Sequence, residues 1–332
     1  MIITRTPFRI SFFGGGTDYP AWYRDHGGAV ISVAINKYCY ITCRYLPPFF
    51  NYKSRIVWSH IEHVSDHADI LHPAVREVLQ FLDIREGVEI HHNADLPSRS
   101  GLGSSSAFTV GLLNALHALQ GKTIDQDALA RVAIHVEQNV LKENVGTQDQ
   151  VAAACGGFNK IEFSKEREFH CAPIVISPAR LADLQAHLML VFTGFSRTAS
   201  IIVAEQVKNI PHKYSELRSI HQMVDEAMNI LASERDITEF GRLLHESWKL
   251  KRSLSDKITN PKIDSMYEAA CHAGAIGGKL LGAGGGGFLI LFVKPERREG
   301  VRTQLSNLLE VPFRFEGSGS QVLSYNNVSK EL

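Results

Sequence analysis

Residues 97–107, Pro-Ser-Arg-Ser-Gly-Leu-Gly-Ser-Ser-Ser-Ala, join a predicted strand to a predicted helix. The strand is the alternating segment 88–96, and the helix is 104–119, where apolar residues repeat at helical spacing. Glycines let a backbone approach an anion closely, and the first N–H groups of a helix have no partner inside it. The helix dipole adds partial positive charge. We therefore expect this tract to cradle phosphate; the alternative is a plain serine-capped helix after a glycine turn.

A second glycine-rich tract, Gly282–Gly287, matches the pattern GxGxxG. A dinucleotide-binding fold needs strand, loop and helix in that order. Here we expect a helical segment before the tract and a strand, 288–293, after it, so we reject the dinucleotide interpretation. So many glycines cost backbone entropy. They indicate that the tract comes close to another backbone or to a ligand.

Two carboxylates are candidates for catalysis or cation binding. Asp149 stands between two glutamines, before an apolar run, where it is a candidate base or cation ligand; the alternative is a helix N-cap. Glu137 lies at the edge of the apolar face of a helix expected over 125–142, so it needs a partner, and a hard cation is one. The alternative is an exposed glutamate paired with a nearby Lys or Arg.

Other polar residues have simpler interpretations when taken alone. Arg9 and Asp18 flank a run of three glycines, where they are interpreted as a surface residue of the first strand and a turn residue. His60, His63 and His67 have the spacing of one helix face. No Cys or carboxylate spacing completes a zinc site there, so a solvated polar face is favoured.

Composition restricts the class of protein. The 332 residues include 35 Lys+Arg and 35 Asp+Glu, a net charge of zero, which argues against a nucleic-acid-binding surface. No run of 18 apolar residues predicts a membrane span, and the first residues lack the basic-then-apolar order of a signal peptide. The five cysteines are odd in number and scattered. We therefore expect a cytoplasmic enzyme with reduced thiols that binds neither nucleic acid nor membrane. Its expected partner is a small molecule, and a homodimer is left open.

Three segments, in this order, resemble the motifs of the GHMP kinases, the small-molecule kinases that include galactokinase, homoserine kinase and mevalonate kinase. The first is 7–18 (PFRISFFGGGTD), the second is 97–107, and the third starts at Lys279 (KLLGAGGGG). The resemblance extends over nearly the whole chain, and three ordered motifs are more specific than any one of them. It implies an enzyme that transfers a phosphoryl group from ATP to a sugar.

The resemblance also implies a role for each motif residue. The phosphates of ATP would lie against the second motif, at Gly101, Leu102, Gly103, Ser104, Ser105 and Ser106. Ser105 and Glu137 would bind Mg²⁺. Asp149 would contact the substrate hydroxyl, with Arg9 as its ion-pair partner. The residues expected to contact the sugar are Gly16, Thr17, Asp18, Gly284 and Gly285.

One departure from the galactokinase motif narrows the expected substrate. Gly14–Gly16 stands where galactokinases carry Gly-Glu-His, which removes galactose contacts and opens space. This form is similar to the branch that acts on heptose phosphates and fucose, and the segment 191–197 (VFTGFSR) favours heptose. The branch implies phosphorylation of the anomeric (C1) hydroxyl of D-glycero-D-manno-heptose 7-phosphate, with Arg197 or Arg99 holding the existing phosphate. The alternatives are a kinase of L-fucose or a hexose, and a non-catalytic sensor of ATP and sugar.

The fold that the resemblance implies is α+β in two lobes, with ATP and sugar in the cleft between them. Residues 1–180 would form the ATP-binding domain, similar to ribosomal protein S5 domain 2. Residues 181–332 would form a ferredoxin-like C-terminal domain.

Overall fold

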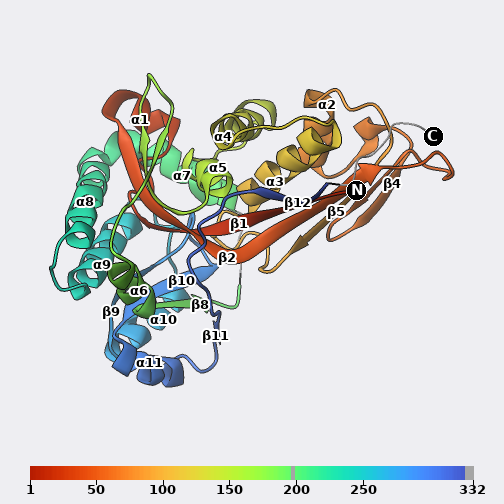
Figure 1. Ribbon diagram of the computed structural model, residues 1–332. Helices are drawn as coiled ribbons and strands as arrows, with labels where there is room; N and C mark the ends of the chain where they lie inside the picture. Colours follow the sequence, from red (N-terminus) through yellow and green to blue (C-terminus); the bar gives the residue numbers. More distant parts are fainter. Residues whose placement is uncertain (196–198, 326–332) are drawn as a thin grey trace.

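The computed structural model describes residues 1–195 and 199–325, which form two β-sheets with helices packed against them (Figure 1). The larger sheet is built on two long strands, β1 (Ile2–Phe13) and β2 (Gly28–Tyr45). β-Branched and aromatic residues run along most of β2, which suits so long a strand. The β1–β2 pairing shifts register at Pro7/Phe8, a bulge at a residue that has no N–H to donate.

The larger sheet has eight strands in the described part of the chain. Their order is β12-β1-β2-β5-β3-β4, with β6 paired to β2 and β7 to β6. The other strands are β3 (Ser54–Val57), β4 (Ile61–Val64), β5 (Val88–Ala94), β6 (Phe158–Phe163), β7 (His170–Pro173) and β12 (Gln321–Tyr325).

Four helices lie together over this sheet (Figure 1). α3 is buried on nearly all sides, because it packs on β1 and β2 below and on α4 and α5 beside it. This packing fixes the N-terminal end of α3 in space, which matters because the glycine-rich loop leads into it. The four helices are α2 (Pro73–Phe81), α3 (Ser104–Leu119), α4 (Gln126–His135) and α5 (Gln148–Cys155).

The smaller sheet has the strand order β11-β8-β10-β9. Its central strand β10 is buried along its whole length, and α9 packs against β9. The strands are β8 (Leu188–Phe192), β9 (Ala275–Leu280), β10 (Phe288–Val293) and β11 (Leu309–Glu310). The remaining helices are α1 (Pro20–His26), α6 (Pro178–Ala186), α7 (Ala199–Asn209), α8 (Tyr214–Ala232), α9 (Thr238–Arg252), α10 (Pro261–His272) and α11 (Arg298–Gln304). In the described residues, no helix has the length and apolar character needed to cross a membrane.

The last described strand does not follow the predicted division at residue 180. That boundary falls between the two sheets, within α6, but β12 crosses back and pairs antiparallel with β1, from Ile2↔Tyr325 to Arg5↔Gln321. The unpaired edge of β1 offers backbone donors and acceptors, and β12 satisfies them. The N-terminal lobe is therefore completed by a segment of the predicted C-terminal domain.

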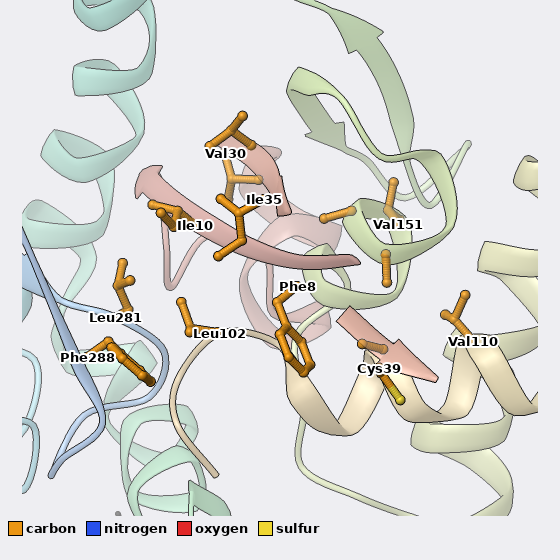
Figure 2. Close-up of a cluster of buried hydrophobic side chains, with 14 of the residues drawn as sticks. Phe8, Ile10, Val30, Ile35, Cys39, Leu102, Val110, Val151, Leu281 and Phe288 are labelled. Atoms are coloured by element: carbon orange, nitrogen blue, oxygen red, sulfur yellow. The ribbon is translucent and has the colours of Figure 1, made fainter. Parts of the chain in front are cut away.

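Apolar side chains join the two lobes at the glycine-rich tracts. Leu102, Leu281 and Phe288 are each at most 1 % exposed, and Figure 2 shows them near one another in the buried cluster. The backbone N–H of Phe288 donates to the carbonyl of Ser100 at 3.2 Å. The two tracts are thus anchored to a common core.

The structure confirms the expected strand over 29–45 and the helix over 104–119, and it corrects three other predictions. The helix over 125–142 ends at His135 and continues as a π-helical turn, Val136–Val140. The three histidines do not share a helix face, because His63 lies in β4 and His67 begins a short 3₁₀ turn. A strand, β9, and not a helix, precedes the glycine tract at 282–287; the tract connects two antiparallel strands, which still excludes a dinucleotide fingerprint.

Candidate active site

Arg9 and Asp149 form a bidentate ion pair. Arg9 on β1 donates from Nε to Oδ1 of Asp149 at 2.8 Å and from Nη2 to Oδ2 at 2.9 Å, and its Nη1 donates to the carbonyl of Gly101 at 2.7 Å. The Arg9 side chain is only 4 % exposed, whereas that of Asp149 is 28 % exposed. Arg9 is therefore not a surface residue. It holds the Asp149 carboxylate against the loop while part of that carboxylate remains open to a ligand.

Asp149 does not serve as a helix N-cap. It lies in the first turn of α5, where Thr147 occupies the N-cap position and the cap makes no side-chain hydrogen bond. The carboxylate is thus bonded to Arg9 and does not cap the helix.

The predicted phosphate loop runs from β5 into α3, and two of its glycines adopt left-handed backbone conformations. Gly101 and Gly103 have φ of +83° and +75°, values that favour glycine. α3 begins at Ser104, so the backbone N–H groups of its first turn have no partners within the helix. Ser105 is exposed in this turn. The loop therefore offers donors at the positive end of a 16-residue helix.

Leu102, which we expected among the phosphate contacts, has a buried side chain that packs in the core. Its side chain is fully buried between the lobes, and its carbonyl accepts the backbone N–H of Arg9 at 3.1 Å. Any phosphate contact by Leu102 is thus left to its backbone N–H. The side chain anchors the loop, and the carbonyl ties it to the strand that carries Arg9.

Glu137 is fully buried in the π-helical turn, which excludes the alternative of an exposed surface pair. Oε2 accepts from Ser106 Oγ at 2.8 Å and from the Gln150 amide, whereas Oε1 has no hydrogen-bond partner in the described residues. Burial raises the pKa of Glu137 to about 7, against the opposing effect of nearby Thr109 and Ser106 hydroxyls. A π-turn often marks a functional position, because it redirects a side chain that a regular helix would place elsewhere.

Asp18 lies near Asp149, and their charges interact. It is buried, and it accepts from the Gly16 N–H at 2.9 Å and from Gln148 Nε2 at 2.8 Å. Burial raises its pKa, with the charge of Asp149 as a smaller contribution in the same direction. Gln148 and Asp149 are consecutive in α5, so Asp18 and Asp149 are held as neighbours. Asp18 is therefore a built part of the site and not a free turn residue.

Thr17 is structural in this arrangement. It is fully buried, and its hydroxyl donates to the carbonyl of Gly14 at 2.8 Å and lies 3.1 Å from that of Ala29. These bonds close the glycine turn in front of Asp18. The Thr17 hydroxyl is thus bonded to backbone groups of Gly14 and Ala29.

The third tract approaches other backbone, as its glycine content indicates. A Cβ on Gly282 would lie 2.4 Å from the Cα of Gly101, and one on Gly284 would lie 2.6 Å from the carbonyl oxygen of Ile258. Gly285 donates its N–H to the same carbonyl at 2.8 Å. Gly284 and Gly285, expected to contact the sugar, therefore pack on the segment after α9, while Gly282 lies against the phosphate loop.

Of the two arginines that we expected could hold a substrate phosphate, the structure describes only Arg99. Arg197 lies outside the described residues. Arg99 is exposed, with φ of +58°, and its backbone N–H donates to Ser104 Oγ at 3.2 Å.

Sequence reasoning missed two buried lysines beside the site. Lys251 on α9 donates to the Gly282 carbonyl, and Lys279 on β9 donates to the Phe12 carbonyl at 2.9 Å. Burial lowers the pKa of Lys251 to about 8 and that of Lys279 well below its ordinary value. Lys251 stands among Lys249 and other basic residues near the end of an amphipathic helix, so its sequence context resembles a solvated face.

A cluster of aromatic rings borders the start of α3, and it was also missed. Phe108 packs against His72 and His92 with ring centroids 4.7 and 4.8 Å apart, and Trp58 packs against His72 at 4.8 Å. Burial and the nearby His72 lower the pKa of His92 to about 4. Histidines on separate strands and helices carry no joint signal in the sequence.

The site combines a glycine loop at a helix N-terminus with an arginine-held carboxylate, an arrangement suited to a small-molecule kinase. The chain belongs to the GHMP kinase family: the GHMP kinases N terminal domain matches residues 68–157, and the GHMP kinases C terminal region matches residues 227–311. Members of this family are ATP-dependent kinases, and so is this protein.

Two relatives place the chain among the sugar kinases of the family. It is 28 % identical over 308 residues to a D-glycero-alpha-D-manno-heptose 7-phosphate kinase from Campylobacter jejuni, covering 90 % of this chain and 91 % of that protein. It is 24 % identical to a bifunctional fucokinase/GDP-fucose pyrophosphorylase from Arabidopsis thaliana, covering 92 % of this chain but 31 % of that longer protein.

A solved structure supports the fold. A D-glycero-D-manno-heptose 1-phosphate kinase from Bacteroides thetaiotaomicron superposes with a TM-score of 0.80 at 23 % identity, covering 98 % of this chain and 100 % of that one. The two-lobed GHMP kinase fold is therefore confirmed.

Proposed function

We propose that this kinase transfers the γ-phosphoryl group of ATP to the anomeric hydroxyl of D-glycero-D-manno-heptose 7-phosphate, forming the 1,7-bisphosphate. The observation that carries the proposal is the Arg9–Asp149 ion pair, which is tied to the predicted phosphate loop through Gly101. Asp18 is held beside it by Gln148, the residue before Asp149. The substrate is suggested by the heptose 7-phosphate kinase of Campylobacter jejuni, which the chain matches over nearly its full length.

The mechanism is positioning and electrostatic stabilisation, as phosphoryl transfer requires. The first N–H groups of α3 hold the phosphates of ATP. Asp149 orients the anomeric hydroxyl and takes its proton as the sugar oxygen bonds to the γ-phosphorus and the bond to ADP breaks. Arg9 keeps the carboxylate in place, and Asp18 accepts a hydrogen bond from a second sugar hydroxyl.

We also propose that Glu137 and Ser105 hold Mg²⁺. The observation that supports a hard cation is Oε1 of Glu137, which is buried without a hydrogen-bond partner in the described residues. Ser105 offers an exposed hydroxyl oxygen next in the chain to Ser106, which is bonded to Glu137. Ser106 and Gln150 orient the Glu137 carboxylate from the side. When bound, the ion would neutralise charge on the ATP phosphates. Removal of Mg²⁺ with EDTA should abolish turnover.

A coupled ADP-release assay with Mg-ATP tests the substrate. We expect the highest kcat/KM with D-glycero-D-manno-heptose 7-phosphate, compared with L-fucose, galactose and mannose. Turnover that is highest on a neutral sugar would retain the kinase but contradict the heptose phosphate. No ADP release with any of the sugars, with ATP still bound, would favour a non-catalytic sensor.

L-Fucose is the second candidate substrate. The fucokinase relative covers 92 % of this chain, and Gly14–Gly16 leaves the sugar side of the site without the larger side chains of galactokinases. A preference for L-fucose in the same assay would establish this alternative.

We place the reaction in the cytoplasm, with small molecules as the partners. All five cysteines are free thiols, which suits a reducing compartment.

A further inference from the structure

Lys251 presents a buried ammonium group with spare hydrogen-bonding capacity. The residue is 7 % exposed, and among the described residues its Nζ has one hydrogen-bond partner, the carbonyl of Gly282. An ammonium group carries three N–H donors and no acceptor. Burying such a group is costly unless its donors are satisfied. A ligand that supplies further acceptors would remove this cost.

Around Lys251, buried cations outnumber the carboxylates. Four other charged groups interact electrostatically with this region: Arg9 on β1, Lys279 on β9, and the carboxylates of Asp18 and Asp149. Both Asp149 oxygens are bonded to Arg9, and Lys279 is bonded to the Phe12 carbonyl. Three buried cations therefore face two carboxylates, and among the described residues Lys251 and Lys279 each have a backbone carbonyl, and no carboxylate, as hydrogen-bond partner.

The position of Lys251 indicates which anion it would bind. The hydrogen-bond partner of Lys251, Gly282, packs so closely on Gly101 that no Cβ fits between them. The carbonyl of Gly101 also accepts a hydrogen bond from Arg9. The ammonium group is thus tied to the phosphate loop on one side and acts on the charges of Asp149 and Asp18 on the other. The group that passes from the loop to the hydroxyl at Asp149 is the γ-phosphoryl group.

We propose that Lys251 is a further catalytic residue, which binds the γ-phosphoryl group of ATP as it is transferred. The proposal rests on the proposed use of ATP at the loop, and it does not depend on which sugar is the acceptor. A fixed cation at this point stabilises charge on the equatorial phosphoryl oxygens without reorganisation.

Calorimetry with two nucleotides, without any sugar, tests this role. Lys251→Met should bind Mg-AMPPNP about 10- to 100-fold more weakly than the wild type, as expected for loss of a charged hydrogen bond, with Mg-ADP affinity within twofold. Lys251→Arg should recover part of the Mg-AMPPNP affinity. Lys279→Met is the matched control, because it removes a buried lysine bonded to β1; it should not weaken Mg-AMPPNP selectively.

Equal losses for both nucleotides in Lys251→Met would show that the lysine merely pins Gly282 beside the loop, and would overturn the proposal. Unchanged affinity for both would overturn it as well. Circular dichroism and the melting temperature check that the variant folds. If Lys251→Met does not fold, the ratio of Mg-AMPPNP affinity to Mg-ADP affinity is measured on Lys251→Arg instead. In that variant, unchanged affinity for both nucleotides together with a lowered kcat would contradict a γ-phosphoryl contact. Failure of the wild type to bind either nucleotide would instead contradict the proposed function.

Discussion

Asp149 is the residue on which the proposed chemistry depends most directly, because it combines a fixed orientation with an exposed edge. Its carboxylate is fixed by two bonds to Arg9, and 28 % of its side chain remains accessible. An amide at this position would keep the shape but could not take the proton of the sugar hydroxyl.

We expect Asp149→Asn to lower kcat by about 10²- to 10⁴-fold, the range for loss of a general base. Binding of Mg-AMPPNP should change little, because the loop amides remain. The ADP-release assay gives kcat, and calorimetry gives the nucleotide affinity. Asp225→Asn is a suitable control, since Asp225 is an exposed partner of Lys160 far along the chain from the motifs. Wild-type turnover in Asp149→Asn would show that the base assignment is wrong.

At the scale of secondary-structure elements, the contact between the two glycine tracts holds the hairpin β9–β10 against the loop before α3. Gly282 has φ of +71° and no space for a Cβ against Gly101. We expect Gly282→Ala to destabilise the protein by about 1–3 kcal/mol and to lower kcat, because the backbone must shift at the phosphate loop.

Urea unfolding and the kinase assay measure the two effects of Gly282→Ala. Gly317→Ala is the control, because a Cβ there meets open space and the backbone is not left-handed. Equal stability of the two variants would contradict the close approach.

The aromatic cluster between β5, α2 and α3 predicts a pH dependence of stability. The folded protein keeps His92 neutral, since its pKa is lowered to about 4 from about 6.5 in the unfolded chain. The unfolded state binds more protons in this window, so this contribution to stability is complete above pH 6.5 and is lost as pH falls toward 4.

His92→Gln should therefore flatten the fall in the free energy of unfolding between pH 6.5 and 4, measured by urea titration at several pH values. His63→Gln serves as the control, because His63 is exposed on β4. If both variants lose stability with acid as steeply as the wild type, His92 does not carry this dependence.

The whole molecule is organised by the return of β12 to the first sheet. Deleting residues 321–332 would leave the outer edge of β1 unpaired. We expect this deletion to lower Tm by about 5–10 °C and to promote aggregation through the exposed edge. Deleting only residues 326–332 keeps β12 and is the control. Scanning calorimetry and light scattering measure both effects, and identical behaviour of the two truncations would contradict a stabilising role for β12.

Local patterns account for the parts of the fold that the sequence predicted well. The helix over 104–119 was predicted with the bounds that α3 has, because its apolar residues and the preceding glycines define it locally. The strand over 29–45 was predicted for similar reasons. The π-turn at Glu137 was not predictable, because it arises from packing and leaves no periodic signal.

The sequence by itself determined the glycine-rich loop before α3, the long strand over 29–45 and the family, since each depends on contiguous residues whose order carries the information. Only the tertiary structure brought Arg9 against Asp149, 140 residues apart, and paired Glu137 with Ser106, 31 residues apart. It also buried Lys251, which looked like one of several solvated lysines, against Gly282. Burial and charge pairing depend on which distant segments meet, and that is decided by packing of the whole chain.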